Sequence, residues 1–111
     1  MAKQTASFIT EESGGTVAVR VGGDFTYELT GKFLSLIRKL AGGRRGALNI
    51  GIDLSDCPFV DSGCMGAMAQ AQKELAALGG SLSIVNAQAQ VLEAMRRIRL
   101  DAVLPVRGKE K

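Results

Sequence analysis

An Asp-Ser pair, Asp61 and Ser62, lies where a short acidic turn meets the start of an expected helix. A phosphate on the Ser62 hydroxyl would carry roughly two negative charges and three acceptor oxygens, which the N–H groups at a helix start can receive. The same charge would lie beside the Asp61 carboxylate and be repelled by it. The pair therefore predicts a serine that acts as a binary label on a binding surface. Spacing alone also allows a plainer interpretation, in which both residues only cap the helix.

Two cysteines, Cys57 and Cys64, flank this turn, and the chain has no histidine. Two free thiols are expected in a cytosolic protein, and two cysteines cannot form a four-cysteine metal site. Without histidine, Ser-His-Asp and Cys-His nucleophile arrangements are excluded within the chain. We therefore expect a protein that is not an enzyme and holds no metal or cofactor. Two alternatives stay open: an enzyme with Ser62 or Cys64 as nucleophile, and a redox role for Cys64, whose thiol pKa a helix start would lower.

Hydrophobic periodicity predicts eight elements along the chain. Asp24 or Thr26 is expected to cap the first helix, which ends at Gly42, and Glu28 is expected in its first turn. The third helix is expected to follow residues 86–87 with the apolar stripe Val91, Leu92, Met95 and Ile98. The strands are expected at residues 7–11, 16–21, 47–54, 81–85 and 103–106, and the second helix at 61–78.

This order predicts one α/β domain over residues 1–111 with a small mixed sheet. An initial hairpin is followed by parallel crossovers, and the helices are expected to cover mainly one face of the sheet. The strictly alternating strand 47–54 is expected at the centre, and the strand that contains Pro105 at an edge. Residues 107–111 are expected to form a disordered tail.

Composition limits the partners and the compartment. No apolar run approaches the roughly 20 residues of a membrane span, and the first residues lack the apolar core of a secretory signal. The net charge is +3, without the dense basic stripe or interleaved aromatics of nucleic-acid binders. We therefore expect a soluble, cytoplasmic protein that binds neither nucleic acid nor membrane directly.

Three separated motifs resemble the STAS domain of anti-sigma factor antagonists. Residues 53–62 match D-L-S-x-x-x-F-[VIM]-D-S, residues 78–86 match L-G-G-x-L-x-[IV]-V-N, and residues 100–106 match L-D-x-V-[FL]-P-V. The motifs occur in the family's order, and the resemblance covers nearly the whole chain. It implies a STAS-like fold for the predicted α/β domain.

The resemblance also implies a function. In that family the serine after the motif aspartate, here Ser62, is phosphorylated by a serine-kinase anti-sigma factor with a GHKL-type ATPase fold. The unphosphorylated antagonist binds this kinase and frees its sigma factor, phosphorylation releases the antagonist, and a PP2C-type serine phosphatase resets it. An acidic residue after the second strand usually lines the same surface. The partner-binding residues implied here are Asp24, Asp56, Phe59, Asp61, Ser62, Gly63, Cys64 and Met65.

The chain departs from the family pattern at several positions. The family usually continues D-S-[ST]-G-L-G, whereas Gly63 removes the second hydroxyl and Cys64 replaces a glycine. Arg99 stands where the family often has glycine. Two alternatives from the same fold stay open: a STAS scaffold or small-ligand-binding module that phosphorylation does not regulate, and a partner-switch regulator of a non-sigma output such as secretion.

Overall fold

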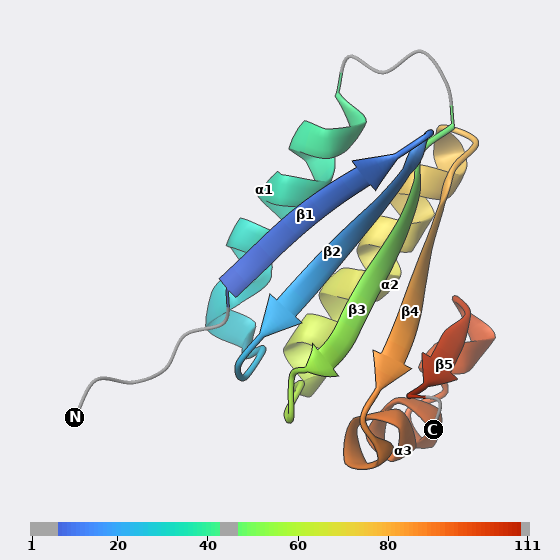
Figure 1. Ribbon diagram of the computed structural model, residues 1–111. Helices are drawn as coiled ribbons and strands as arrows, with labels where there is room; N and C mark the ends of the chain where they lie inside the picture. The colour runs from blue at the N-terminus through green and yellow to red at the C-terminus, as the bar shows by residue number, and fades with distance from the viewer. Residues whose placement is uncertain (1–6, 43–46, 110–111) are drawn as a thin grey trace.

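The computed structural model describes residues 7–42 and 47–109, and within these residues the chain forms a mixed sheet with helices packed against it (Figure 1). The predicted α/β fold is confirmed. The strands are β1 (Ser7–Ser13), β2 (Thr16–Gly22), β3 (Asn49–Asp56), β4 (Ser81–Ala87) and β5 (Val106–Gly108). The helices are α1 (Thr30–Ala41), α2 (Ser62–Ala77) and α3 (Ala89–Arg97), with short 3₁₀ turns η1 (Tyr27–Leu29) and η2 (Leu100–Ala102).

The strand order in the sheet, β1-β2-β3-β4-β5, is the order of the strands along the chain. β1 and β2 are antiparallel, and their tight connection uses Gly14 and Gly15, which have positive φ angles of 54° and 84°. The pairs β2–β3, β3–β4 and β4–β5 are parallel. As predicted, β3 is the central strand and β5, which follows Pro105, is an edge strand.

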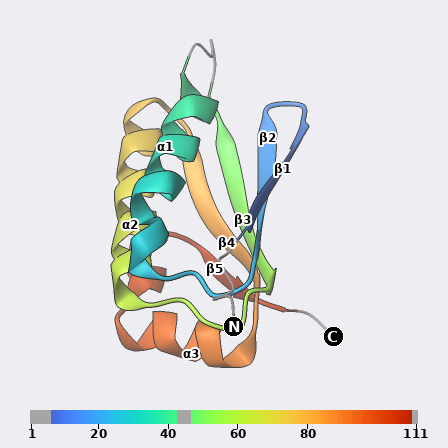
Figure 2. The same ribbon diagram turned by 90° about the vertical axis from the view of Figure 1, so that its left-hand side faces the viewer.

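The core lies between one face of the sheet and the two long helices, α1 and α2, whereas the opposite face of the sheet carries no described helix (Figure 2). Alternate residues of β2, β3 and β4 face this core, as strand periodicity requires. A cluster of three phenylalanines closes one end, with ring centroids 5.5 Å apart for Phe8 and Phe25 and 5.3 Å for Phe25 and Phe33. Phe25 thereby anchors the loop that leads from β2 to the candidate site. The buried strand residues are Val17, Val19, Val21, Ile50, Ile52, Leu54, Leu82 and Ile84.

The start of α1 differs from the prediction. The helix begins at Thr30, and its N-cap residue, Leu29, makes no side-chain capping hydrogen bond. Neither Asp24 nor Thr26 caps α1, because the chain first forms the 3₁₀ turn η1, whose N-cap is Thr26 without a side-chain bond. Glu28 therefore lies in η1 and not in the first turn of α1.

The last strand begins later than predicted, at Val106 and not at residue 103. The preceding residues close a turn instead, because the backbone N–H groups of Val103 and Leu104 both donate to the Leu100 carbonyl. The strand then continues into the predicted tail: residues 107–108 belong to β5, and the Lys109 N–H donates to the Ala87 carbonyl at 2.9 Å. The expectation of disorder is thus wrong for residues 107–109, and residues 110–111 lie outside the described part.

The end of α3 also differs in one residue of its expected apolar stripe. Val91 and Met95 are buried, but Ile98 follows the last helical residue and is 50% exposed. The next residue, Arg99, has a left-handed backbone with φ 64°. That conformation explains why glycine suits this position in similar sequences.

No helix within the described residues is long and apolar enough to cross a membrane.

Candidate functional site

Two loops meet beyond the carboxyl ends of β2 and β3. The Gly23 N–H donates to the Asp56 carbonyl at 3.0 Å, and the Phe25 N–H donates to the Phe59 carbonyl at 2.9 Å. The Asp61 N–H returns a bond to the Phe25 carbonyl at 3.1 Å. These bonds hold the loop of residues 23–26 beside the turn of residues 56–61. The structure therefore brings Asp24 to the turn that carries the Asp-Ser pair.

The Asp61 carboxylate joins two elements that are 34 residues apart in sequence. Asp61 is the N-cap of α2, and its Oδ1 accepts a hydrogen bond from the Cys64 N–H at 2.9 Å. Its Oδ2 accepts a hydrogen bond from the Tyr27 N–H, the first of η1, at 2.6 Å. Both oxygens are thus engaged by backbone donors, one at the start of each helical element. The capping role allowed from the sequence is confirmed, and the second bond explains why η1 forms where it does.

Ser62 and Gly63 are both exposed at the start of α2. Gly63 lies against the backbone of η1: a Cβ added to it would lie 2.9 Å from the Tyr27 Cβ and 3.4 Å from the Asp61 Oδ1. Real Cβ atoms do not approach other atoms so closely, so glycine fits here because Tyr27 occupies the space. The missing second hydroxyl of the motif therefore has a local steric cause.

Tyr27 is the neighbour that sequence reasoning missed. Its side chain is 67% exposed although its backbone N–H is bonded to Asp61. Periodicity placed it within a helix, where a lone tyrosine carries no functional signal. The departure at Gly63 was the one available sign that a bulky neighbour packs on this turn.

The exposed side chains around Ser62 combine aromatic rings with carboxylates. Phe59 is 51% exposed, and Asp24 and Asp56 are both exposed. The two loops that build the site, residues 22–31 and 56–63, contain four carboxylates and no lysine or arginine, although the whole chain has a net charge of +3. We call the surface formed by Asp24, Tyr27, Asp56, Phe59 and Ser62 the acidic face.

Two residues expected on the partner surface are instead in the core. Cys64 is fully buried and Met65 is 3% exposed, so neither side chain is available to a partner. Burial, together with the nearby Asp61 carboxylate, raises the pKa of the Cys64 thiol, which opposes the lowering expected at a helix start. Burial also raises the pKa of Cys57, whose Sγ donates to the Phe59 carbonyl at 3.2 Å. Both thiols are free but shielded, which argues against a redox role for Cys64 and against Cys64 as a nucleophile.

The turn of the acidic face is also braced by two glutamines at the start of α3. Gln88 donates from Nε2 to the Ser55 carbonyl at 2.9 Å, and Gln90 donates from Nε2 to the Pro58 carbonyl at 3.2 Å. These glutamines were not singled out from the sequence, because their targets are backbone atoms more than 30 residues away. With the bonds to Gly23 and Phe25 described above, they hold the turn from two sides.

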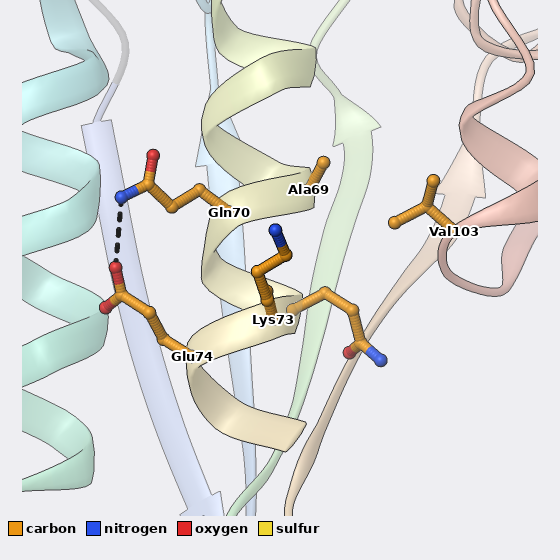
Figure 3. Close-up of a pocket in the computed structure, with 6 residues that line it drawn as sticks. Ala69, Gln70, Lys73, Glu74 and Val103 are labelled. Carbon is orange, nitrogen blue, oxygen red and sulfur yellow. Dashed lines mark hydrogen bonds between the residues drawn. The ribbon is translucent and has the colours of Figure 1, made fainter. Parts of the chain in front are cut away.

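A separate groove of about 660 Å³ lies between α2 and the segment that follows α3 (Figure 3). It begins at Ala69, seven residues after Ser62, which is about 10 Å along the helix axis. Figure 3 shows Ala69 on the side toward Val103, whereas Gln70 and Glu74 are joined by a hydrogen bond on another side of α2. None of the expected site residues lines this groove. Within the described residues there is also no cluster of three or more potential metal ligands.

Comparison with known proteins gives a family and a fold. A family model described as "Mlab, STAS domain" matches residues 8–105. No curated protein gives a significant sequence match.

Three solved structures illustrate the likeness in fold. A candidate anti-sigma factor antagonist from Thermotoga maritima has a TM-score of 0.79 at 20% identity, over 90% of this chain and 85% of that chain. The Bacillus cell fate determinant SpoIIAA in its phosphorylated form has a TM-score of 0.66 at 19% identity, over 90% of each chain. The murine solute carrier 26 family member A9 anion transporter has a TM-score of 0.68 at 19% identity, over 86% of this chain but only 17% of that one. At these identities the likeness shows the fold.

Proposed function

This chain belongs to the STAS domain family, and on that premise we propose that it is a non-catalytic anti-sigma factor antagonist that works by partner switching in the cytoplasm. In its unphosphorylated form it binds a serine-kinase anti-sigma factor with a GHKL-type ATPase fold, which then releases its target. The kinase transfers the γ-phosphoryl group of ATP to the Ser62 Oγ, which loses its proton as ADP forms. The phosphorylated protein dissociates, and a PP2C-type phosphatase hydrolyses the phosphate to restore the hydroxyl.

The position of Ser62 is the observation that carries this proposal. Its hydroxyl group is exposed at the first residue of α2, on a turn whose backbone is bonded to the β2–η1 loop and to α3. A kinase needs such an accessible acceptor, and a rigid turn presents it in one geometry without a large ordering cost. The exposed Phe59 and Tyr27 rings beside it are of the type that often dominates the energy of a protein interface.

Charge supports the class of partner. The acidic face is negative on a chain that is positive overall, so a partner with a basic rim would be attracted and oriented by it. The centre of that partner has to hold the anionic phosphates of ATP close to Ser62. A phosphate on Ser62 would then face both the nucleotide and the Asp61 carboxylate. A loss of about 3 kcal/mol from the repulsion between this phosphate and the nucleotide lowers affinity about a hundredfold.

Phosphorylation of Ser62 is tested by incubating the protein with ATP and a candidate serine kinase of this class, followed by intact mass and site mapping. We expect one added phosphate, on Ser62. Ser62→Ala should remain unmodified and stay bound to the kinase, and Ser62→Asp should bind more weakly than the parent. Ser35, which is exposed on α1 away from the acidic face, provides the matched control: Ser35→Ala and Ser35→Asp should behave like the parent. Equal binding by Ser62→Asp and the parent would refute the switch.

A second candidate is a STAS module that acts as a scaffold without phosphorylation. The likeness to one segment of a much larger anion transporter supports it, because the matching segment covers only 17% of the transporter chain. In that case a protein that binds the kinase would stay unmodified, and Ser62→Ala would leave the output unchanged. Whether the output is a sigma factor or another pathway, such as secretion, depends on the partner and is read by identifying what the bound kinase releases.

A further inference from the structure

We infer that Asp61 is a positioning residue that couples Ser62 to the η1 turn, so that a phosphate on Ser62 acts on the acidic face by loosening Tyr27. The inference rests on the proposed phosphorylation of Ser62 and goes beyond it. It assigns to this chain a second place where a partner reads the phosphate, in a segment that is 35 residues earlier in sequence.

The coupling is built from two hydrogen bonds on one carboxylate. Asp61 holds the Tyr27 N–H at 2.6 Å through Oδ2 and the Cys64 N–H at 2.9 Å through Oδ1. The Cβ of Tyr27 lies against Gly63, the residue that follows Ser62, with no room for a further side chain between them. Ser62 therefore lies in sequence between Asp61, whose carboxylate binds the Tyr27 N–H, and Gly63, which packs against the Tyr27 Cβ.

A phosphate on Ser62 would disturb this arrangement in two ways. It would add roughly two negative charges next to the Asp61 carboxylate, which disfavours the present position of that carboxylate. It would also offer acceptor oxygens to the N–H groups of the first turn of α2, including the one that Asp61 now holds at Cys64. Two anions would then compete for the same donors, and a carboxylate that moves away loses its bond to Tyr27.

The loosened turn lies on the surface that the partner meets. Tyr27 is 67% exposed. Its N–H is held by Asp61 and its carbonyl accepts a bond from the Thr30 Oγ1 at 2.9 Å, whereas the following α1 has no side-chain cap of its own. An aromatic ring with a fixed backbone contacts a partner at low entropic cost, and a mobile one does not. Phosphorylation would thus weaken binding through the order of Tyr27 as well as through charge.

Asp61→Asn separates the two roles of the carboxylate. Asparagine caps a helix about as well as aspartate, so the bond to Cys64 can be kept. Its second terminal atom is an NH₂ donor, which cannot accept a bond from the Tyr27 N–H. We expect the amide of Tyr27 to exchange with solvent about 10- to 100-fold faster in Asp61→Asn, while the amide of Met65, bonded to the Asp61 carbonyl, changes little.

The decisive experiment places phosphoserine at position 62 by genetic encoding, so that no kinase is needed, and follows backbone amides by ¹H–¹⁵N NMR and hydrogen exchange. The Tyr27 amide is expected to shift and to exchange at least tenfold faster than in the parent protein. Because the chain has one tyrosine and no tryptophan, the intrinsic fluorescence reports the same site independently. Phosphoserine at Ser13, exposed at the hairpin end of the sheet, is the matched control and should leave Tyr27 unchanged.

The outcomes separate this inference from the proposed function. An unchanged Tyr27 amide in the phosphoserine-62 protein overturns the coupling, even where a kinase modifies Ser62. If the Tyr27 amide exchanges with solvent as slowly in Asp61→Asn as in the parent protein, the positioning role of Asp61 is overturned. If Asp61→Asn fails to fold, the phosphoserine-62 protein still tests the coupling, because it keeps Asp61. Failure of every candidate kinase to modify Ser62 would count against the proposed function. It would not affect the two measurements on the Tyr27 amide, because neither of them uses a kinase.

Discussion

Gly63→Ala tests the close approach of η1 to the start of α2. An ideal Cβ at Gly63 would lie 2.9 Å from the Tyr27 Cβ and 3.7 Å from its Cα, so backbone-attached atoms of η1 would have to move. Overpacking of this kind costs about 1–3 kcal/mol. Replacing glycine by alanine in a helix returns about 0.5–1 kcal/mol of backbone entropy and helix propensity. The expected net effect is a loss of up to about 2.5 kcal/mol in the free energy of unfolding.

Gly66→Ala is the matched control, because Gly66 lies in the same helix and a Cβ added there meets no atom within 4 Å. It should gain about 0.5–1 kcal/mol, so the two alanine variants should differ by about 1–3 kcal/mol. For a domain of this size each kcal/mol moves the melting temperature by roughly 4–8 °C. Urea unfolding with a common m value measures the difference directly.

A second mutation at Tyr27 identifies the clashing atom. Tyr27→Phe keeps the Cβ and should leave the penalty of Gly63→Ala unchanged, whereas Tyr27→Gly removes the Cβ and should abolish most of it. The double-mutant cycle is therefore expected to show a coupling only with glycine at position 27. If Gly63→Ala stabilises the protein as much as Gly66→Ala, the steric explanation for the missing second hydroxyl is refuted.

Two further predictions concern titration and reactivity. Arg38 donates to Glu74 at 3.0 Å and 2.8 Å, and these bonds lower the pKa of Glu74 to about 2. The stabilising contribution of the ionised Glu74 should thus be complete above the ordinary glutamate pKa of about 4.5 and disappear as the pH falls toward 2. Urea titrations of the parent and Glu74→Gln should therefore converge over that interval, and a difference independent of pH would contradict the ion pair. Cys57 and Cys64 should react with iodoacetamide at pH 8 only after unfolding, because burial raises both pKa values; rapid alkylation of the native protein would show that one of them is accessible.

Regular parts of the fold could be predicted because local pattern and tertiary environment agree. Ile50, Ile52 and Leu54 alternate in β3, which is central, and all three are buried. Phe33 and Ile37 repeat at helical spacing in α1, and both face the core. In such segments the period of the apolar residues specifies both the element and its buried face.

The errors occur where hydrogen bonds, and not the apolar pattern, decide the local structure. η1 begins at Tyr27 because the Asp61 carboxylate takes its N–H, and no residue near Tyr27 indicates this. The last strand is delayed because the Leu100 carbonyl closes a turn. α2 presented a different difficulty, because Cys64 and Met65 were placed on the partner surface by the family resemblance and not by their spacing, and the structure buries both.

The candidate site could be predicted in part. Asp61 and Ser62 are indicated by their place at the turn before the second helix, whereas Asp24, Asp56 and Phe59 are implied by the resemblance to the STAS family. Tyr27 can be assigned to the site only from the structure, in which η1 packs against Gly63.

The strand order has a consequence for how the protein is made. Because the sheet is assembled in chain order, each strand that leaves the ribosome finds its neighbour already synthesised. Both loops of the acidic face precede β4, yet Gln88 and Gln90, which brace the turn from α3, follow it. At about 5–20 residues per second, the stretch from Ser62 to Gln90 takes roughly 1–6 s to be synthesised. We expect a nascent chain to pair its first strands during that interval and to complete its binding turn only once Gln90 has been made.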